Sequence, residues 1–219
     1  MVERIGTYAR TTGETDLRVT VGLDGTGQAT ISTGNGMFDH LLHQLSRHGL
    51  FDLTISASGD SQMTGWHHTV EDTGIALGRA FLDAIGEGIG IRRMGHALVP
   101  LDEALARVAV DFSGRGYSAI DLDVTGTDIA GLPGDMVRHF LESFAAEARI
   151  TLHATIIHGI NAHHKVEAIF KAMAKALRDV SLKETLTSSL SSSRLRKEDS
   201  LSDPESDWVA VEDKVSKGA

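Results

Sequence analysis

Two copies of one five-residue pattern carry the side chains of this sequence that are best suited to bind metal ions. Each copy has two adjacent histidines, then a valine and a glutamate at the same spacing, and good helix formers follow it. The ligand types are His67, His68 and Glu71 in the first copy, and His163, His164 and Glu167 in the second. Imidazoles and carboxylates are common metal ligands. We interpret the pattern as paired metal sites in a duplicated fold.

The spacing within each copy indicates how the ligands are shared. On a helix, His67 and Glu71 are four residues apart and lie on the same face. His68 lies about 100° further round the helix. Adjacent imidazoles therefore cannot easily serve one ion, and we expect them to face different ions, with each helix bridging two sites. The same holds for the second copy.

Two further histidines complete the set. His40 precedes His67 by 27 residues, and His139 precedes His163 by 24. The two histidines lie at corresponding places on the helices predicted before the two motifs. Six histidines and two glutamates would give three imidazoles and one carboxylate per ion, a donor set that suits Mn, Fe or Zn. Four histidines without a repeat partner are taken as structural: His43, His96, His153 and His158.

Composition excludes several other kinds of site. The 219-residue chain has no cysteine, which excludes disulfides, thiolate-bound zinc and iron–sulfur clusters. Its net charge of −9 argues against nucleic acid as a main partner. The N-terminus shows no apolar signal segment, and no apolar run is long enough to span a membrane. We therefore expect a cytoplasmic protein with neither nucleic-acid nor membrane partners.

The order of predicted secondary-structure elements repeats once along the chain. The first repeat has strands at 3–10, 15–23, 27–32 and 51–57 and helices at 37–48 and 67–85. The second has strands at 94–100, 104–112, 116–124 and 149–157 and helices at 136–148 and 162–180. Asp24 and Gly25 predict a hairpin between the second and third strands.

Both repeats read βββαβα, so we predict an α+β fold. The fold is an internal duplication in which each lobe is a four-stranded sheet with two helices, and the lobes share one core. We place the first lobe at 1–92 and the second at 93–182. Residues 183–219 form a tail that is first serine-rich and then of mixed charge, a composition typical of flexible or conditionally ordered segments.

Seven stretches of the sequence closely resemble the imidazoleglycerol-phosphate dehydratases. They are residues 38–49, 67–78, 90–95, 100–106, 111–115, 138–144 and 163–172. The resemblance runs in order over about residues 3–180. It implies a lyase of histidine biosynthesis that dehydrates D-erythro-imidazole-glycerol phosphate to imidazole-acetol phosphate. It also implies two Mn²⁺ ions per active site and a homo-oligomer of 24 chains with active sites between subunits.

The chemistry of such a dehydration is consistent with two metal ions. The proton that is lost lies on a carbon of the substrate's side chain and is not acidic in water. Metal binding to the ring as imidazolate makes the ring an electron reservoir. The C3 hydroxyl can then leave through a diazafulvene-like intermediate held between the two ions.

The resemblance assigns roles residue by residue. The metal ligands fall on the eight residues named above: His40, His67, His68, Glu71, His139, His163, His164 and Glu167. Glu167 or Glu71 is the candidate catalytic carboxylate that moves protons, with Glu14 near the substrate. The implied substrate and phosphate contacts are Glu14, Gln44, His48, Arg93, Arg115, Lys171, Ser216 and Lys217.

Three features depart from the family's pattern. Gly116 stands where the family usually has proline, so the turn that presents Arg115 is expected to be looser. The segment ending at Trp66 lacks the acidic residues common before the histidine pair. An extra stretch precedes Ser216 and Lys217, and we expect it to loop out so that these residues still close the site.

Two other functions compete with the dehydratase. One is a non-catalytic metal-binding assembly protein on the same scaffold. The other is a metal-dependent hydrolase or isomerase of another small phosphate ester. The presence of Arg93, Arg115 and Lys171 favours the dehydratase, because a non-catalytic relative has little need of phosphate donors.

Truncation after Val215 tests the predicted role of the chain end. Removing Ser216 and Lys217 should weaken substrate affinity about tenfold, because one charge-assisted phosphate contact contributes roughly 1.5–3 kcal/mol. The measurement is KM with saturating metal. A KM equal to that of the full chain would contradict the role of both residues.

Overall fold

The computed structural model describes residues 3–60 and 64–183. The tail from residue 184 onward, including Ser216 and Lys217, lies outside the described residues. The described residues contain four helices of 14 to 20 residues and two four-stranded sheets.

The elements follow the predicted order closely. The first repeat comprises β1 (Ile5–Thr11), β2 (Asp16–Gly22), β3 (Ala29–Ser32), α1 (Gly36–Gly49), β4 (Asp52–Ser58) and α2 (His67–Ile85). The second comprises β5 (Met94–Leu101), β6 (Ala104–Asp111), β7 (Tyr117–Asp121), α3 (Gly134–Glu147), β10 (Thr151–His158) and α4 (Ala162–Ser181).

The two sheets have the same topology. Their strand orders are β1-β2-β4-β3 and β5-β6-β10-β7, and in each the last pair is parallel while the others are antiparallel. This confirms the α+β fold and the duplicated βββαβα unit. The lobe boundary between residues 92 and 93 stays a prediction.

The predicted hairpin at Asp24 and Gly25 is wrong. β4 lies between β2 and β3 and pairs with both. Asp52, at the start of β4, accepts hydrogen bonds at Oδ1 from the backbone amides of residues 26–28, at 2.9–3.0 Å. The turn is therefore bent around the start of β4, and β3 is left as the edge strand.

A short hairpin directly before α3 was not predicted. It pairs β8 (Asp128–Ile129) with β9 (Leu132–Pro133). Strands of two residues are too short to show an alternating pattern, so periodicity could not reveal them.

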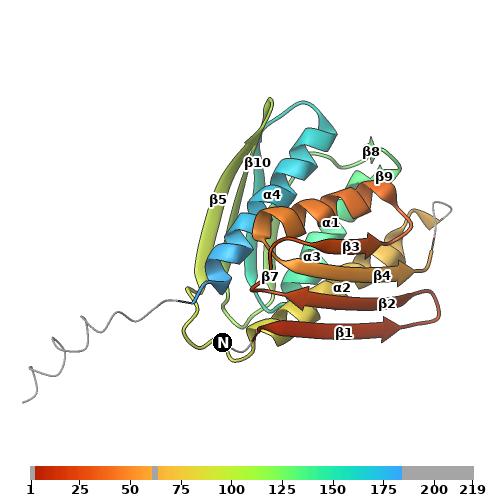
Figure 1. Cartoon of the computed structure of the whole chain (residues 1–219). Helices are drawn as coiled ribbons and strands as arrows, with labels where there is room; N and C mark the ends of the chain where they lie inside the picture. Colours follow the sequence, from red (N-terminus) through yellow and green to blue (C-terminus); the bar gives the residue numbers. More distant parts are fainter. Residues whose placement is uncertain (1–2, 61–63, 184–219) are drawn as a thin grey trace, which may run out of the picture. The chain divides into compact units, whose positions relative to one another are not determined.

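The helices join the repeats. α2 packs on β1 and β2, and α4 packs on β5 and β6. Across the repeats, α2 packs on α3 and α1 packs on α4, so the helices are gathered between the two sheets (Figure 1). One apolar core runs through these contacts. None of the helices in the described ranges combines the length and apolar character needed to cross a membrane.

Corresponding glycines allow the first strand of each repeat to approach its helix closely. Gly6 in β1 faces the Ala80 carbonyl of α2, and Gly95 in β5 faces the Ala176 carbonyl of α4. A methyl group at Gly95 would lie 2.5 Å from that oxygen and 2.7 Å from Asp179 Cβ. The duplication thus extends to the contact between strand and helix.

Gly95→Ala should destabilise the chain by roughly 1–3 kcal/mol, because the new methyl group meets backbone atoms that cannot move away cheaply. Urea unfolding measures the change. Gly36→Ala at the start of α1 is the matched control, since a methyl group there meets no atom of the described residues within 4 Å. That variant should be neutral or up to about 1 kcal/mol more stable. Equal stability of the Gly95 variant and the parent chain would contradict the close approach.

Candidate active site

The histidine pairs lie at the first residues of α2 and α4, and polar side chains hold both helix starts. Asn161 caps α4, its Oδ1 accepting from the amides of His163 and His164 at 2.8 and 3.3 Å. Asp60 binds the start of α2, its carboxylate accepting from the amides of His68 and Thr69 at 3.1 and 2.8 Å. These contacts satisfy amides that have no partner within the helix.

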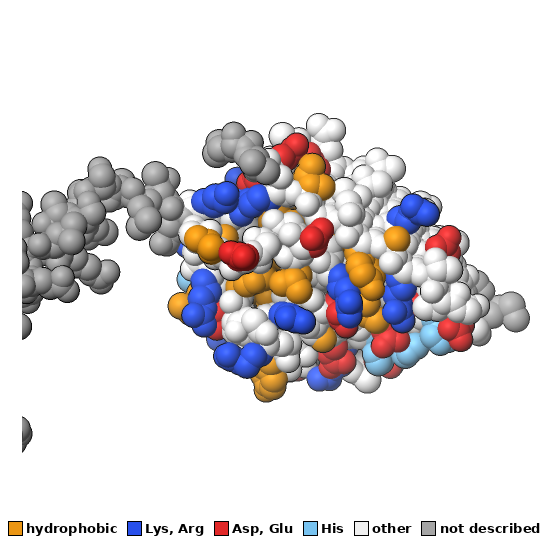
Figure 2. All heavy atoms as spheres, turned by 90° about the horizontal axis from the view of Figure 1, so that it is seen from below, with side chains coloured by type: hydrophobic (Ala, Val, Ile, Leu, Met, Phe, Trp, Pro, Cys, Tyr) orange, Lys and Arg blue, Asp and Glu red, His pale blue; other side chains and the backbone are white. Residues whose placement is uncertain are grey.

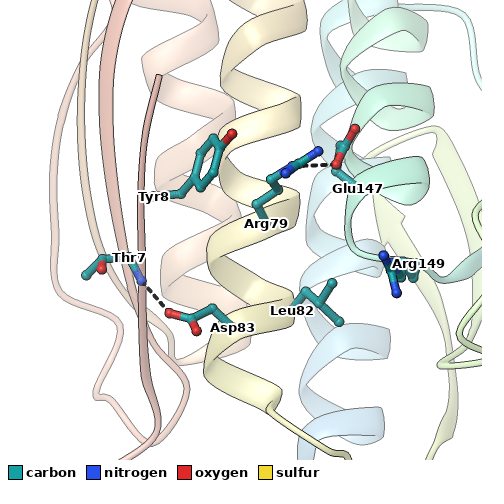
Figure 3. Close-up of a pocket in the computed structure, with 7 residues that line it drawn as sticks. All are labelled: Thr7, Tyr8, Arg79, Leu82, Asp83, Glu147 and Arg149. Carbon is teal, nitrogen blue, oxygen red and sulfur yellow. Dashed lines mark hydrogen bonds and ion pairs between the residues drawn. The ribbon is translucent and has the colours of Figure 1, made fainter. Parts of the chain in front are cut away.

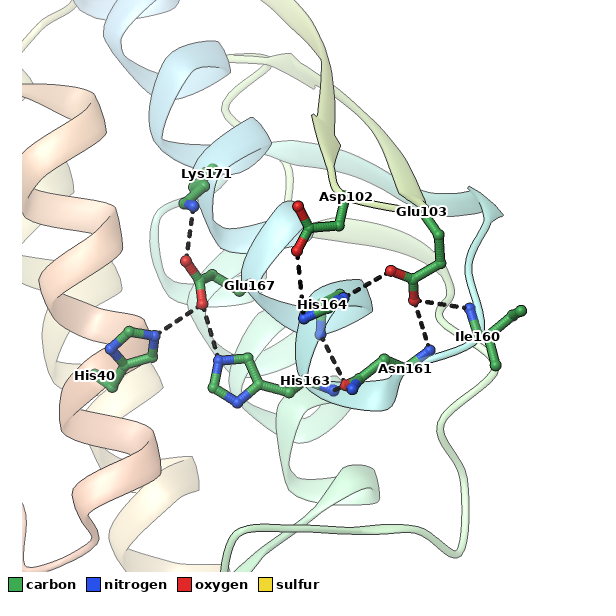
Figure 4. A network of polar contacts seen from close by, with 9 residues as sticks. All are labelled: His40, Asp102, Glu103, Ile160, Asn161, His163, His164, Glu167 and Lys171. Atoms are coloured by element: carbon green, nitrogen blue, oxygen red, sulfur yellow. Dashed lines mark hydrogen bonds and ion pairs between the residues drawn. The ribbon is translucent and has the colours of Figure 1, made fainter.

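The first cluster joins α1 to α4. His40 Nε2 and His163 Nε2 each lie 2.9 Å from Glu167 Oε2, and the three ligand atoms lie within 4.8 Å of one another (Figure 4). Lys171 Nζ lies 2.7 Å from the other oxygen of Glu167. Two imidazoles and one carboxylate thus converge in a geometry that a metal ion could take.

The electrostatics of Glu167 follow from these contacts. Partial burial acts to raise the pKa of its carboxyl, and hydrogen bonds from His40, Lys171 and His163 outweigh it, lowering the pKa to about 2. Glu167 is therefore a carboxylate at neutral pH.

The second cluster joins α2 to α3. The His67 and His139 rings have centroids 4.9 Å apart, and His67 Nε2 lies 3.6 Å from Glu71 Oε2. The Glu71 side chain is 39% exposed, against 12% for Glu167. The second cluster therefore repeats the residue types of the first in a looser, more open arrangement.

The second histidine of each pair lies outside its cluster. The His67 and His68 rings meet at 86°, and the His163 and His164 rings at 83°. Adjacent residues of a helix point about 100° apart around its axis, which directs neighbouring imidazoles to different places. Whether any of the eight residues binds metal stays a prediction.

Each of these outer histidines faces a carboxylate that sequence reasoning missed. His164 Nδ1 lies 2.7 Å from Glu103 Oε2. The hydrogen bond from His164, followed by that from the Asn161 amide, lowers the pKa of Glu103 to about 2, and the same bond raises the pKa of His164. His68 Nδ1 lies 3.3 Å from Asp60 Oδ2 without hydrogen-bond geometry.

A polar strip continues from the first cluster along α1 and α4. His40, Gln44 and His48 recur every four residues on α1, opposite Lys171 and Lys175 of α4. The pKa of His48 is lowered by partial burial and then by the charges of both lysines and Arg47. The strip is a positively charged path that leads away from Glu167.

Of three further predicted substrate residues, Glu14 lies near the start of α2: a methyl group placed at Gly59 would be 3.0 Å from the Glu14 carbonyl oxygen and 2.8 Å from Thr69 Oγ1. Glu14 is exposed in the β1–β2 turn, and Arg115 is exposed in the β6–β7 turn. The Arg93 amide donates to Val180 near the end of α4. Since His163 starts α4, the two ends lie about 25 Å apart at 1.5 Å per residue. In the described residues, no hydrogen bond or ion pair links these three to either cluster.

The histidines taken as structural do not join the clusters. All four are exposed: His43, His96, His153 and His158. His96 and His153 flank Ala109 on the outer face of the second sheet. Elsewhere on the surface, Figure 2 shows histidine side chains gathered beside acidic ones at one edge of the molecule.

A separate pocket lies between β1, α2 and the end of α3. Charged side chains line it, and several already have partners (Figure 3). Arg79 Nε lies 2.6 Å from Glu147, and Asp83 accepts from the Thr7 amide at 3.1 Å. Because it contains no candidate residue, and Arg79 and Glu147 pair with each other, we do not take it as the catalytic site.

Comparisons with known proteins agree on one family. The family model described as imidazoleglycerol-phosphate dehydratase matches residues 33–177. The protein of that name from Dehalococcoides mccartyi strain CBDB1 is 53% identical over 177 residues, which cover 81% of this chain and 88% of the relative. The one from Paracidovorax citrulli is 54% identical over 176 residues, covering 80% and 84%.

Solved structures give the same result. The imidazoleglycerol-phosphate dehydratase of Staphylococcus aureus superposes with a TM-score of 0.73 at 34% identity, covering 83% of this chain and 99% of that one. The Pyrococcus furiosus enzyme, in complex with (S)-C348, gives 0.71 at 32% identity, covering 83% and 98%.

Replacement of Glu167 by Gln should change how stability depends on pH in metal-free protein. A carboxyl whose folded pKa is depressed stabilises the fold above its unfolded pKa, and that stability is lost as pH falls toward the folded pKa. At pH 6 the free energy of unfolding of the parent chain should be about 1–3 kcal/mol larger than that of the variant. The difference should shrink between about pH 4.5 and about pH 3, toward the folded pKa of about 2.

Urea unfolding in the presence of a chelator, at several pH values, measures this difference. Glu87→Gln removes an exposed carboxylate outside the clusters and serves as the control. Its unfolding free energy should change with pH in parallel with that of the parent. If the unfolding free energy of the Glu167 variant also changes with pH in parallel with that of the parent, the depressed pKa of Glu167 is ruled out.

Proposed function

The chain belongs to the imidazoleglycerol-phosphate dehydratase family, whose members are hydro-lyases of histidine biosynthesis, and we propose the following reaction for it. The protein removes water from D-erythro-imidazole-glycerol phosphate in the cytoplasm and gives imidazole-acetol phosphate. Two Mn²⁺ ions serve each active site. The observation that carries this proposal is the pair of histidine–glutamate clusters at equivalent places of the two repeats.

The donor set supports the metal sites. In the first cluster, two imidazole nitrogens and one carboxylate oxygen already lie within 4.8 Å of one another. The second cluster offers the same types of atom. Nitrogen and oxygen donors without thiolate suit Mn²⁺. When bound, the ions would supply positive charge that stabilises the imidazolate form of the substrate ring.

Placement of the candidate residues supports an oligomer with active sites between chains. His68 and His164 lie outside the clusters of their own chain. Arg93 lies about 25 Å along α4 from His163. A substrate that touches a cluster and Arg93 together therefore needs residues of two chains. We propose a homo-oligomer of 24 chains in which neighbours complete one another's sites.

The chain's own residues would bind the substrate and move the protons. Glu167 is a carboxylate at neutral pH, and it is held by His40, His163 and Lys171. Glu71 is more exposed and less tightly held. The C3 hydroxyl can leave as ring electron density forms a diazafulvene-like intermediate, and either carboxylate can then take the proton from the neighbouring carbon to give the enol of the product. Glu14 lies near the substrate.

Cationic and polar side chains would hold the phosphate and the sugar-derived chain of the substrate. Lys171, Gln44 and His48 lie on the strip beside the first cluster. Arg93 and Arg115 are exposed at the other end of the second sheet, where a neighbouring chain's cluster can reach them. Guanidinium groups bind phosphate oxygens through paired hydrogen bonds. We assign Ser216 and Lys217 to the same phosphate.

Metal reconstitution tests the proposal. Protein stripped with a chelator should not dehydrate imidazole-glycerol phosphate, and activity should return as Mn²⁺ is added, reaching its maximum at about two bound ions per chain. The measurement combines product formation with a count of bound metal. Two bound ions without turnover would favour the non-catalytic assembly protein, and no bound metal would refute the metal sites.

Glu167→Gln should abolish turnover, with a loss of at least about 1000-fold, because the substitution removes a carboxylate that binds metal or moves a proton. Size-exclusion chromatography should show an unchanged assembly. Glu87→Gln should keep full activity. A fully active Glu167 variant would contradict its role.

A further inference from the structure

Glu103 uses both carboxylate oxygens at the start of α4. Its Oε2 lies 2.7 Å from His164 Nδ1 (Figure 4). Its Oε1 accepts from the amides of Ile160 and Asn161, at 3.3 and 2.8 Å. The glutamate comes from the turn between β5 and β6, 61 residues before His164. One side chain thus connects that turn, the turn before α4 and the second histidine of the pair.

These contacts determine which nitrogen of His164 carries a proton. A carboxylate can only accept, so Nδ1 must donate and keep its proton. Nε2, on the opposite side of the ring, is then the atom with a lone pair available to a cation. The exposed Asp102 carboxylate lies 3.7 Å from Nε2, beyond hydrogen-bond distance.

The first repeat has a counterpart built from a different segment. His68 Nδ1 faces the carboxylate of Asp60, which lies in the loop between β4 and α2. Asp60 also binds the start of its helix, whereas in the second repeat Asn161 caps the helix and Glu103 faces the ring. The same ring atom therefore lies near a carboxylate in both repeats, but only the contact of His164 with Glu103 has hydrogen-bond geometry, and the carboxylates are not equivalent in sequence.

We propose that Glu103 is a positioning residue for the reaction: by accepting the Nδ1 proton of His164 it orients the ring and keeps Nε2 as the metal-binding atom. The inference rests on the proposed function, in which His164 binds metal. Carboxylates that hold a ligand histidine in this way typically change metal affinity 10- to 100-fold when they are removed.

Two substitutions separate this role from a purely structural one. In Glu103→Gln the amide oxygen still has to accept from Ile160 and Asn161, so the amide NH₂ group faces His164 Nδ1. It donates to Nδ1, the ring proton moves to Nε2, and the metal-binding lone pair is lost. In Glu103→Ala the turn contacts are lost, but water can accept from Nδ1. A positioning role therefore makes the Gln variant the weaker metal binder, and a structural role makes the Ala variant the weaker one.

The experiment measures Mn²⁺ binding to the metal-stripped, full-length assembly by the electron paramagnetic resonance signal of free Mn²⁺. Glu103→Gln should weaken the affinity for one of the two ions 10- to 100-fold and leave the affinity for the other unchanged. Glu103→Ala should weaken the affinity for the same ion less than Glu103→Gln does. Glu87→Gln, which removes an exposed carboxylate elsewhere, should bind both ions like the parent.

A double-mutant cycle shows whether Glu103 acts through the histidine. In a His164→Gln background, which has no Nδ1, the effect of Glu103→Gln on affinity should disappear. An equal effect in both backgrounds would overturn the proposal, and so would unchanged affinity of Glu103→Gln in the parent background. The cycle compares folded variants, because Glu103→Gln keeps an acceptor for both turn amides.

Failure of the proposed function gives a different result. A parent chain that binds no Mn²⁺ refutes the metal centre and this inference with it. If the parent chain binds two ions and Glu103→Gln leaves the affinity for both unchanged, this inference alone is refuted.

Discussion

Phe140 of α3 stacks on Phe170 of α4 with ring centroids 5.3 Å apart, and it meets the edge of Phe38 of α1 at 5.4 Å. All three rings are buried. Phe38 lies two residues before His40, and Phe140 directly follows His139. The packing that joins the repeats in the core therefore also decides which histidines face each other at the surface. Because His40 meets the motif of α4 and His139 meets that of α2, each cluster depends on helices from both repeats.

The core contact alone does not complete the geometry, because each helix start also needs polar partners. A start that carries two adjacent histidines has unpaired amides, and one of its rings points away from the cluster. The two repeats meet this need in different ways. Asp60 accepts from the amides of His68 and Thr69 and also lies 3.3 Å from the His68 ring, whereas Asn161 binds the amides and Glu103 binds the ring in the second repeat. Eight residues separate β4 from α2, against three between β10 and α4, and this longer connection includes Asp60.

Local patterns in the sequence predicted the structural features that depend on residues close together in the chain. Alternation and helical spacing located the helices and the long strands, and the repeated histidine motif pointed to both clusters. Strand order was not local: the hairpin prediction at Asp24 failed because β4 pairs on both of its edges. The cross-packing of repeats and the contact of Glu103 with His164 join residues far apart in the chain, and no spacing rule reports them. The 100–106 stretch that resembles the family contained Glu103, but nothing in its pattern indicated a histidine partner.

The crossed arrangement of the helices bears on how such a chain could have arisen. A half-length ancestor with a single βββαβα unit could not build a cluster alone, since its first helix faces the motif of another unit. Two identical copies related by a twofold axis would build two identical clusters at once. Fusion of the genes would then release the two clusters from symmetry. Two differences are seen now: Glu167 is tightly held whereas Glu71 is open, and Asn161 and Glu103 stand in the second repeat where Asp60 stands alone in the first. Only the fused chain can encode such differences.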